Sequence, residues 1–192
     1  MKNRKLLIIG FVLVALAQLY VPASMILEKE EVLETGKMYK FKTAPIDPTD
    51  PFRGKYIVLN FTNNSVMVDE DENWMYEEDL YVFLKEDAKG YAIIDSVSKN
   101  KPEHTADYFK AKYIRIYEKE LFVKYPFNRY YMEESKAYEA ELAYRKSVVS
   151  QQQKTYAKVM VKDGVAVLVD VLINEVSIRE VVKANRLEKE GT

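Results

Sequence analysis

Residues 6–27 form a run without a single charged side chain, and this run constrains the fold more than any other part of the chain. An α-helix of this length rises about 33 Å, which is enough to cross the hydrocarbon core of a bilayer. Lys2, Arg4 and Lys5 precede the run, and basic residues beside a span stay in the cytoplasm. We therefore expect a single transmembrane helix, with the N-terminus in the cytoplasm and the rest of the chain outside. Pro22 is expected to bend or end the regular helix.

Two alternatives remain open for the same run. Ala15-Leu16-Ala17 fits the small-residue pattern of a signal-peptide cleavage site, and a cleaved leader would export the domain as well. The apolar residues that follow this site favour the uncleaved anchor, because cleavage would leave them exposed at a new N-terminus. A core helix of a cytosolic protein is the least favoured alternative, since the run has no polar face.

The composition predicts one domain outside the membrane. The chain has 192 residues, of which 48% are hydrophobic, and this supports a single domain with a real core. The net charge is −1, so we expect no nucleic-acid partner. The chain has no cysteine, which excludes disulfides, thiolate metal ligands and a cysteine nucleophile.

A proline-rich turn at residues 45–54 is the second feature that constrains the fold. It contains several prolines, each of which fixes its own φ angle and favours an extended conformation at the residue before it. Gly54 closes the turn and can adopt a positive φ or let another backbone approach closely. We expect the turn to hold three charged side chains at the mouth of the next strand: Asp47, Asp50 and Arg53. An ion pair that staples the turn is the simplest role for them.

The strand after the turn is predicted at residues 56–62. Apolar side chains alternate there with a period of two, which is typical of a strand with one buried face. The buried face is expected to contain Ile57, Leu59 and Phe61. Tyr56 and Asn60 then lie on the opposite face.

The sequence from the turn into this strand is Gly54-Lys55-Tyr56-Ile57-Val58-Leu59-Asn60-Phe61. This run resembles the signature of the GDYXXLXY family of membrane-anchored bacterial proteins. Residues 45–53 resemble the segment that leads into the signature, and residues 127–131 resemble a second stretch of the family more loosely. Lys55 stands where the signature has Asp, and Phe61 stands where it has Tyr. The resemblance implies a short anchor and one outward domain in the bacterial cell envelope. It does not indicate which biochemical activity, if any, the domain has.

The rest of the chain predicts a mostly antiparallel β domain. Two hairpins are expected, with Gly90 and Gly164 at their turns. One helix is expected at residues 133–150, where Glu141 and Arg145 form a favourable i, i+4 pair. The predicted strands are residues 38–43, 56–62, 80–85, 90–97, 111–117, 121–127, 155–161 and 165–173, and residues 176–182 extend or add a strand.

We therefore expect an α+β fold: a single N-terminal transmembrane helix followed by a mostly antiparallel β domain, a curved sheet or partly open barrel, with one inserted helix. The expected boundaries are 1–27 for the transmembrane anchor, 28–37 for a juxtamembrane spacer, 38–185 for the extracytoplasmic domain and 186–192 for a charged tail that frays. The helix is expected to continue into the spacer for a turn or two and to end at Gly36.

No metal site or cofactor is expected. The acidic stretch at residues 69–79 lacks the central glycine of an EF-hand, so it is interpreted as a solvated loop, with Trp74 and Met75 folded back onto the domain. His104 is the only histidine, and a lone histidine does not form a zinc site. No G-x-S-x-G motif provides a nucleophilic serine to pair with it.

Two functions fit these features. The first is a non-catalytic binding or accessory domain that contacts another envelope or integral membrane protein, with Arg53, Tyr56 and Asn60 forming or bracing the contact surface. Gln18 supports a helix partner in the membrane, because a hydrogen bond between helices would satisfy its polar group.

The alternative is a cell-envelope hydrolase in which Asp47, Asp50 or Glu133 acts as general acid or base. Arg129 and Tyr130 could then stack on a sugar or meet an anionic group, while their simpler role is to pack under the helix. A cleft that joins the turn to residues 129–134 would favour an enzyme, and a filled surface would favour binding.

Overall fold

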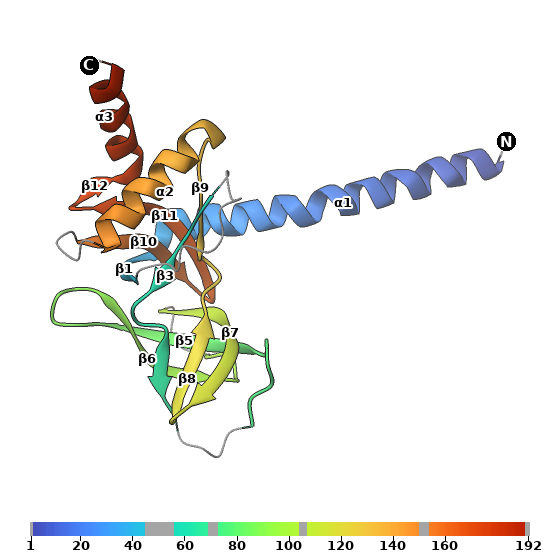
Figure 1. Cartoon of the computed structure of the whole chain (residues 1–192). Coiled ribbons are helices and arrows are strands. Elements are labelled where there is room, and N and C mark those ends of the chain that lie inside the picture. The colour runs from blue at the N-terminus through green and yellow to red at the C-terminus, as the bar shows by residue number, and fades with distance from the viewer. Residues whose placement is uncertain (1, 45–55, 69–72, 104–106, 150–153, 191–192) are drawn as a thin grey trace.

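A computed structural model describes residues 2–44, 56–68, 73–103, 107–149 and 154–190, and all structural statements below concern these residues (Figure 1). Three helices, α1 (Lys2–Thr35), α2 (Glu134–Val149) and α3 (Ile178–Glu190), accompany a set of short strands. The strands are β1 (Lys37–Ala44), β2 (Tyr56–Val58), β3 (Asn60–Phe61), β4 (Ser65–Met67), β5 (Asp79–Glu86), β6 (Ala92–Ser98), β7 (Tyr108–Tyr117), β8 (Glu120–Lys124), β9 (Arg129–Tyr131), β10 (Thr155–Lys162), β11 (Val165–Ile173) and β12 (Val176–Ser177).

The strands form a nearly closed, barrel-like arrangement of three sheets. One sheet has the order β12-β11-β10-β1-β3, a second has the order β4-β8-β7-β5-β6, and β2 and β9 form a two-stranded ribbon. The pairings between these strands are antiparallel. The first two sheets meet where the backbone of Gly164 exchanges hydrogen bonds with Tyr108 and Lys110, at 3.1 and 2.8 Å. The predicted α+β class is confirmed.

A cluster of aromatic rings fills the core between the sheets. Phe41, on β1, lies at its centre, with its ring centroid 4.9 Å from that of Phe127 and 5.5 Å from that of Tyr125. Phe61 and Phe109 complete the cluster from β3 and β7, at 5.8 and 6.3 Å from Phe41. Rings packed at these distances and tilts add to the stabilisation that burial provides. The cluster joins three strands that belong to two different sheets.

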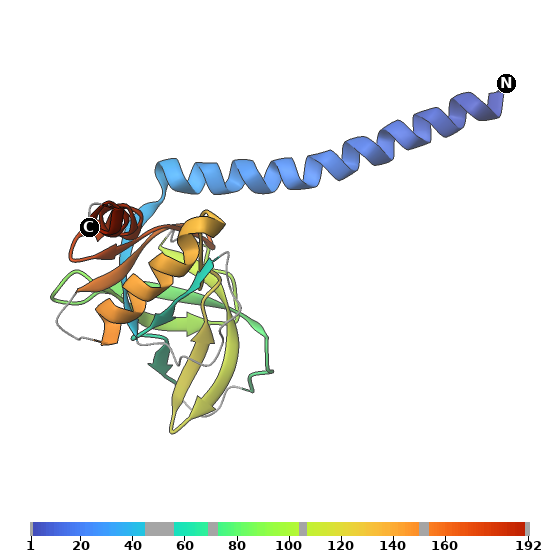
Figure 2. The same cartoon turned by 45° about the horizontal axis from the view of Figure 1, so that its top comes forward.

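Helix α1 leaves this body as one long shaft that continues through Pro22 (Figures 1 and 2). Among the described helices, α1 is the one long and apolar enough to cross a membrane, and its most apolar stretch is not buried in the body. It is therefore compatible with a membrane anchor. Its last turns pack on the sheet: Val32 is only 3% exposed, and Lys162 on β10 bonds Glu31 at 2.6 Å and Thr35 at 2.9 Å.

Gly36 joins α1 to β1 where the two backbones come close together. Its N–H donates to the carbonyl of Val32 at 2.9 Å, which ends the helix as predicted. A Cβ atom at this position would lie 2.5 Å from the Val32 carbonyl oxygen and 3.1 Å from that of Val161. Only glycine lets the chain pass from α1 into the sheet at this distance.

The structure corrects the prediction for the C-terminal residues. Residues 178–190 form helix α3, where a strand at 176–182 and a frayed tail from 186 were expected. Ile178 and Val182 are fully buried one helical turn apart, and the Ser177 side chain accepts a hydrogen bond from the Arg179 N–H at 3.3 Å. The β-branched residues favoured a strand in the sequence, but their spacing also fits a helix with one buried face.

Other differences are local. The strand predicted at 56–62 is divided at Leu59, so that β2 and β3 pair with different partners. Strands β4 and β9 were not predicted. Sequence alternation does not reveal where a strand changes its neighbour.

The prediction that Trp74 folds back onto the domain is confirmed, because its ring stacks on that of Tyr113 at 5.9 Å. The same prediction for Met75 is wrong, because Met75 is 71% exposed.

Replacing Gly36 with Ala should destabilise the folded domain by about 1–3 kcal/mol, because the new methyl group overlaps two backbone carbonyls that cannot move independently. Thermal unfolding of the full chain in detergent measures this. Gly10→Ala is the matched control, since a Cβ there meets nothing within 4 Å. Equal unfolding temperatures for the two variants would contradict the tight junction.

Candidate functional site

The ribbon of β2 and β9 brings together the two segments that the sequence singled out. Its register pairs Tyr56 with Tyr131, Ile57 with Tyr130, and Val58 with Arg129. Because neighbouring side chains of a strand point to opposite faces, the ribbon has two different faces. Ile57 and Tyr130 are buried on the inner face.

The outer face of the ribbon presents Tyr56, Arg129 and Tyr131, which we call the ribbon cluster. The rings of the two tyrosines lie 5.4 Å apart, and the Arg129 guanidinium lies 5.0 Å from the centre of the Tyr56 ring. A hydrogen bond with the Tyr131 side chain, together with the nearby Tyr56, raises the pKa of Arg129. Tyr131 is 60% exposed. The cluster is thus a cationic and aromatic surface that is held in place before any ligand arrives.

The inner face connects the ribbon to β11 and α3 through Tyr130. The Tyr130 hydroxyl donates to the Asp170 carboxylate at 2.9 Å, and the Ser177 hydroxyl bonds the same oxygen at 3.2 Å. The Arg179 guanidinium lies 5.4 Å from the centre of the Tyr130 ring. Burial, followed by the negative charge of Asp170, raises the pKa of Tyr130 to about 12. The phenol is therefore a neutral, fixed donor at physiological pH.

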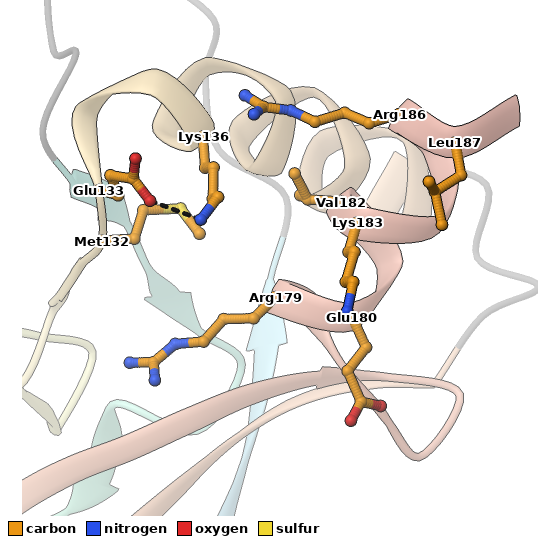
Figure 3. A pocket seen from close by; sticks show the side chains of 9 residues that line it. All are labelled: Met132, Glu133, Lys136, Arg179, Glu180, Val182, Lys183, Arg186 and Leu187. Atoms are coloured by element: carbon orange, nitrogen blue, oxygen red, sulfur yellow. Dashed lines mark hydrogen bonds and ion pairs between the residues drawn. The ribbon is translucent and has the colours of Figure 1, made fainter. Parts of the chain in front are cut away.

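A groove of about 660 Å³ lies directly after the ribbon, between the start of α2 and one side of α3 (Figure 3). Met132, Glu133 and Lys136 form one wall, with Glu133 and Lys136 paired at 2.5 Å. Side chains of α3 form the other wall: Arg179, Glu180, Val182, Lys183, Arg186 and Leu187. Arg186 also bonds Glu139 on α2, at 2.5 Å, and so fixes the two helices to each other.

The predicted site residues are partly brought together. Tyr56, Arg129 and Tyr130 meet in the ribbon, and Glu133 lines the adjacent groove. Asn60 is exposed but lies on β3, which pairs with β1 and not with β9. Asp47, Asp50, Arg53 and Gly54 lie outside the described residues, as does His104.

Within the described ranges, no cluster of three or more His, Cys, Asp or Glu side chains could hold a metal ion. Two carboxylates at the site are engaged by nearby donors: Asp170 next to the ribbon by Tyr130, and Glu133 in the groove by Lys136. The arrangement suits recognition of a partner by stacking and by cationic hydrogen bonds.

Several residues of the site were missed from the sequence, namely Asp170, Ser177, Arg179 and Leu187. They come from β11, β12 and α3, and each lies about 40 residues or more after the ribbon in the chain. One signal for α3 was present, because Ile178 and Val182 recur at i and i+4. No local pattern indicates that Asp170 meets Tyr130, since that contact depends on how the sheets pack.

Replacing Asp170 with Asn should lower the pKa of Tyr130, but only part of the way to its ordinary value of 10.0, because burial is the larger cause of the shift. Since the folded state holds the phenol protonated, Tyr130 contributes stability below pH 10 that is lost as pH rises toward 12. That alkaline loss should be smaller in D170N. NMR titration of ¹³Cζ-labelled tyrosine, with Tyr130→Phe identifying the signal, measures the pKa; an unchanged pKa in D170N would contradict the contact.

Comparison with known proteins gives one match. Residues 18–171 match the model of a protein family described as GDYXXLXY protein. No curated protein matches this chain, and no solved structure does. The family match covers well over half of the 192 residues. It includes both strands of the ribbon, β2 and β9, and the strands β3 and β10 that pair with β1. The protein therefore belongs to the GDYXXLXY family.

Proposed function

We propose that this protein is a non-catalytic binding or accessory protein of the bacterial cell envelope. In this proposal α1 is a single-pass anchor at residues 6–27, the N-terminus is cytoplasmic, and the body after it is extracytoplasmic. Three basic residues before the run support this orientation, because they resist translocation. The ligand is another envelope or integral membrane protein.

The observation that supports binding most strongly is the rigid mounting of the body on its anchor. The last turns of α1 pack on β10 and β11 through Val32 and the Glu31–Lys162 pair, and Gly36 leads straight into β1. The body therefore cannot rotate freely on a linker. Holding the body in one orientation costs conformational entropy. That cost is offset when one face of the body must meet a partner in the same membrane, because less freedom is then lost on binding.

The ribbon cluster is the surface that we assign to this contact. Tyrosine and arginine are enriched where proteins bind one another, and here they are already ordered by stacking on each other. Tyr56 is also the first described residue after the segment that contains Asp47, Asp50 and Arg53. Gln18 in the span offers a second contact inside the membrane.

A hydrolase remains the second candidate because Glu133 lines a groove beside the ribbon. Its carboxylate lies 2.5 Å from Lys136, and its side chain is 61% exposed, so it is screened by solvent and by a cation. Such a carboxylate is poorly suited to act as a general acid. Release of fragments from purified peptidoglycan by the wild type, and its loss in Glu133→Gln, would establish the hydrolase in place of the binding protein.

Cysteine labelling tests the orientation, because the native chain has no cysteine. Lys89→Cys, in the exposed turn between β5 and β6, should react with a membrane-impermeant maleimide on intact spheroplasts. Lys5→Cys should react only after the membrane is permeabilised. The reverse pattern would place the body in the cytoplasm and overturn the proposal.

Photo-crosslinking tests the ribbon cluster as a contact surface. Benzoylphenylalanine at position 131 should give a discrete protein adduct in cells, and the same probe at position 117 should not. The two native tyrosines are matched controls, at 60% and 62% exposed, on different parts of the surface. The partner caught at position 131 should co-purify less with Gln18→Leu. An identical set of adducts from both positions, or none from position 131, would contradict the assignment.

A further inference from the structure

The groove between α2 and α3 has an excess of positive charge. Its lining contains four cationic side chains, Lys136, Arg179, Lys183 and Arg186, and two carboxylates, Glu133 and Glu180. Arg179, Lys183 and Arg186 follow one another at i, i+4 and i+7, so they form a row along α3. Figure 3 shows Arg179 extending from α3 toward the wall that contains Met132.

The cations of the groove are partly ordered in advance. Arg179 rests over the Tyr130 ring at 5.4 Å, and Arg186 is fixed by Glu139 at 2.5 Å. Ordering a long side chain on binding costs free energy, and these two have already lost much of that freedom. Lys183, between them in the row, is exposed.

Apolar surface accompanies this charge. Met132 lines the groove and is half-buried, and Leu187 is 62% exposed although it is a large apolar side chain. A groove formed by two helix surfaces, with apolar and charged side chains along it, has the form that receives an amphipathic helix. Its volume of about 660 Å³ admits a short segment and not a folded domain.

We propose that this groove binds an acidic, amphipathic segment of a partner protein, in which carboxylates meet the cationic row of α3 and an apolar side chain packs against Leu187 and Met132. This inference rests on the proposed binding function and specifies the chemistry of the partner. Anionic lipid offers similar charges, but Figures 1 and 2 show α3 on the side of the body away from the apolar end of α1. Helix α3, which forms one wall of the groove, thus lies far from the segment of α1 that would enter a bilayer.

The test uses the full chain in phosphatidylcholine nanodiscs and a fluorescent 15-residue helical peptide with glutamates four residues apart and one central leucine. Two matched peptides replace the glutamates with glutamine or the leucine with serine. Fluorescence anisotropy should show tighter binding of the glutamate–leucine peptide than of either matched peptide. Lys183→Glu should weaken its binding roughly tenfold, because one attractive contact becomes repulsive.

The control for that variant is Lys89→Glu, which makes the same charge change in an exposed turn away from the groove and should bind like the wild type. Leu187→Ser should weaken the glutamate–leucine peptide but not the glutamate–serine peptide. Equal affinities for the glutamate and glutamine peptides, or equal losses in Lys183→Glu and Lys89→Glu, would overturn the proposal. So would displacement of the peptide by phosphatidylglycerol vesicles in a manner that depends on Lys183.

Failure of the groove can be told apart from failure of the binding function. If the peptides do not bind but the probe at position 131 still gives its adduct in cells, the protein has a partner and only the groove assignment is wrong. If neither experiment gives binding, the proposed function fails as well.

Discussion

The close contact between the end of α1 and β10 determines how the rest of the molecule is placed. The backbone of Gly36 lies so close to the carbonyl groups of Val32 and Val161 that no larger residue fits there. Strand β1 then begins at once as an inner strand of its sheet. From β1, Phe41 enters the centre of the aromatic core. A helix long enough to cross a bilayer is thereby connected to the core of the body without a flexible linker. The orientation of every surface relative to α1 follows from this junction.

The ribbon and the groove are parts of one connected surface. Tyr131 ends the ribbon, and Met132 and Glu133 follow it directly into the groove. On the inner side, Tyr130 contacts Asp170 on β11 and Arg179 on α3, so the same residue supports both regions. Because Tyr130 is buried and hydrogen-bonded, both regions are held by the same fixed side chain.

The residues of the family signature have different structural roles. Leu59 and Phe61 are buried in the core, and phenylalanine fits there because the neighbouring rings provide an apolar environment. Tyr56 lies instead on the outer face, stacked with Tyr131 and Arg129. The short segment from Tyr56 to Phe61 thus serves both the fold and the surface, because its side chains alternate between the two faces.

The sequence alone determined the features that depend on local physics. The apolar run required a long helix, Gly36 ended it, and the glycines at 90 and 164 marked two hairpin turns, because each of these follows from backbone geometry or from neighbouring residues. Alternation likewise identified the buried face of residues 57–61. Only the tertiary structure decided that β2 pairs with β9, that residues 178–190 form a helix, and that Asp170 and Arg179 reach Tyr130. These contacts join segments far apart in the chain, and the free energy that selects them comes from packing that no local pattern contains.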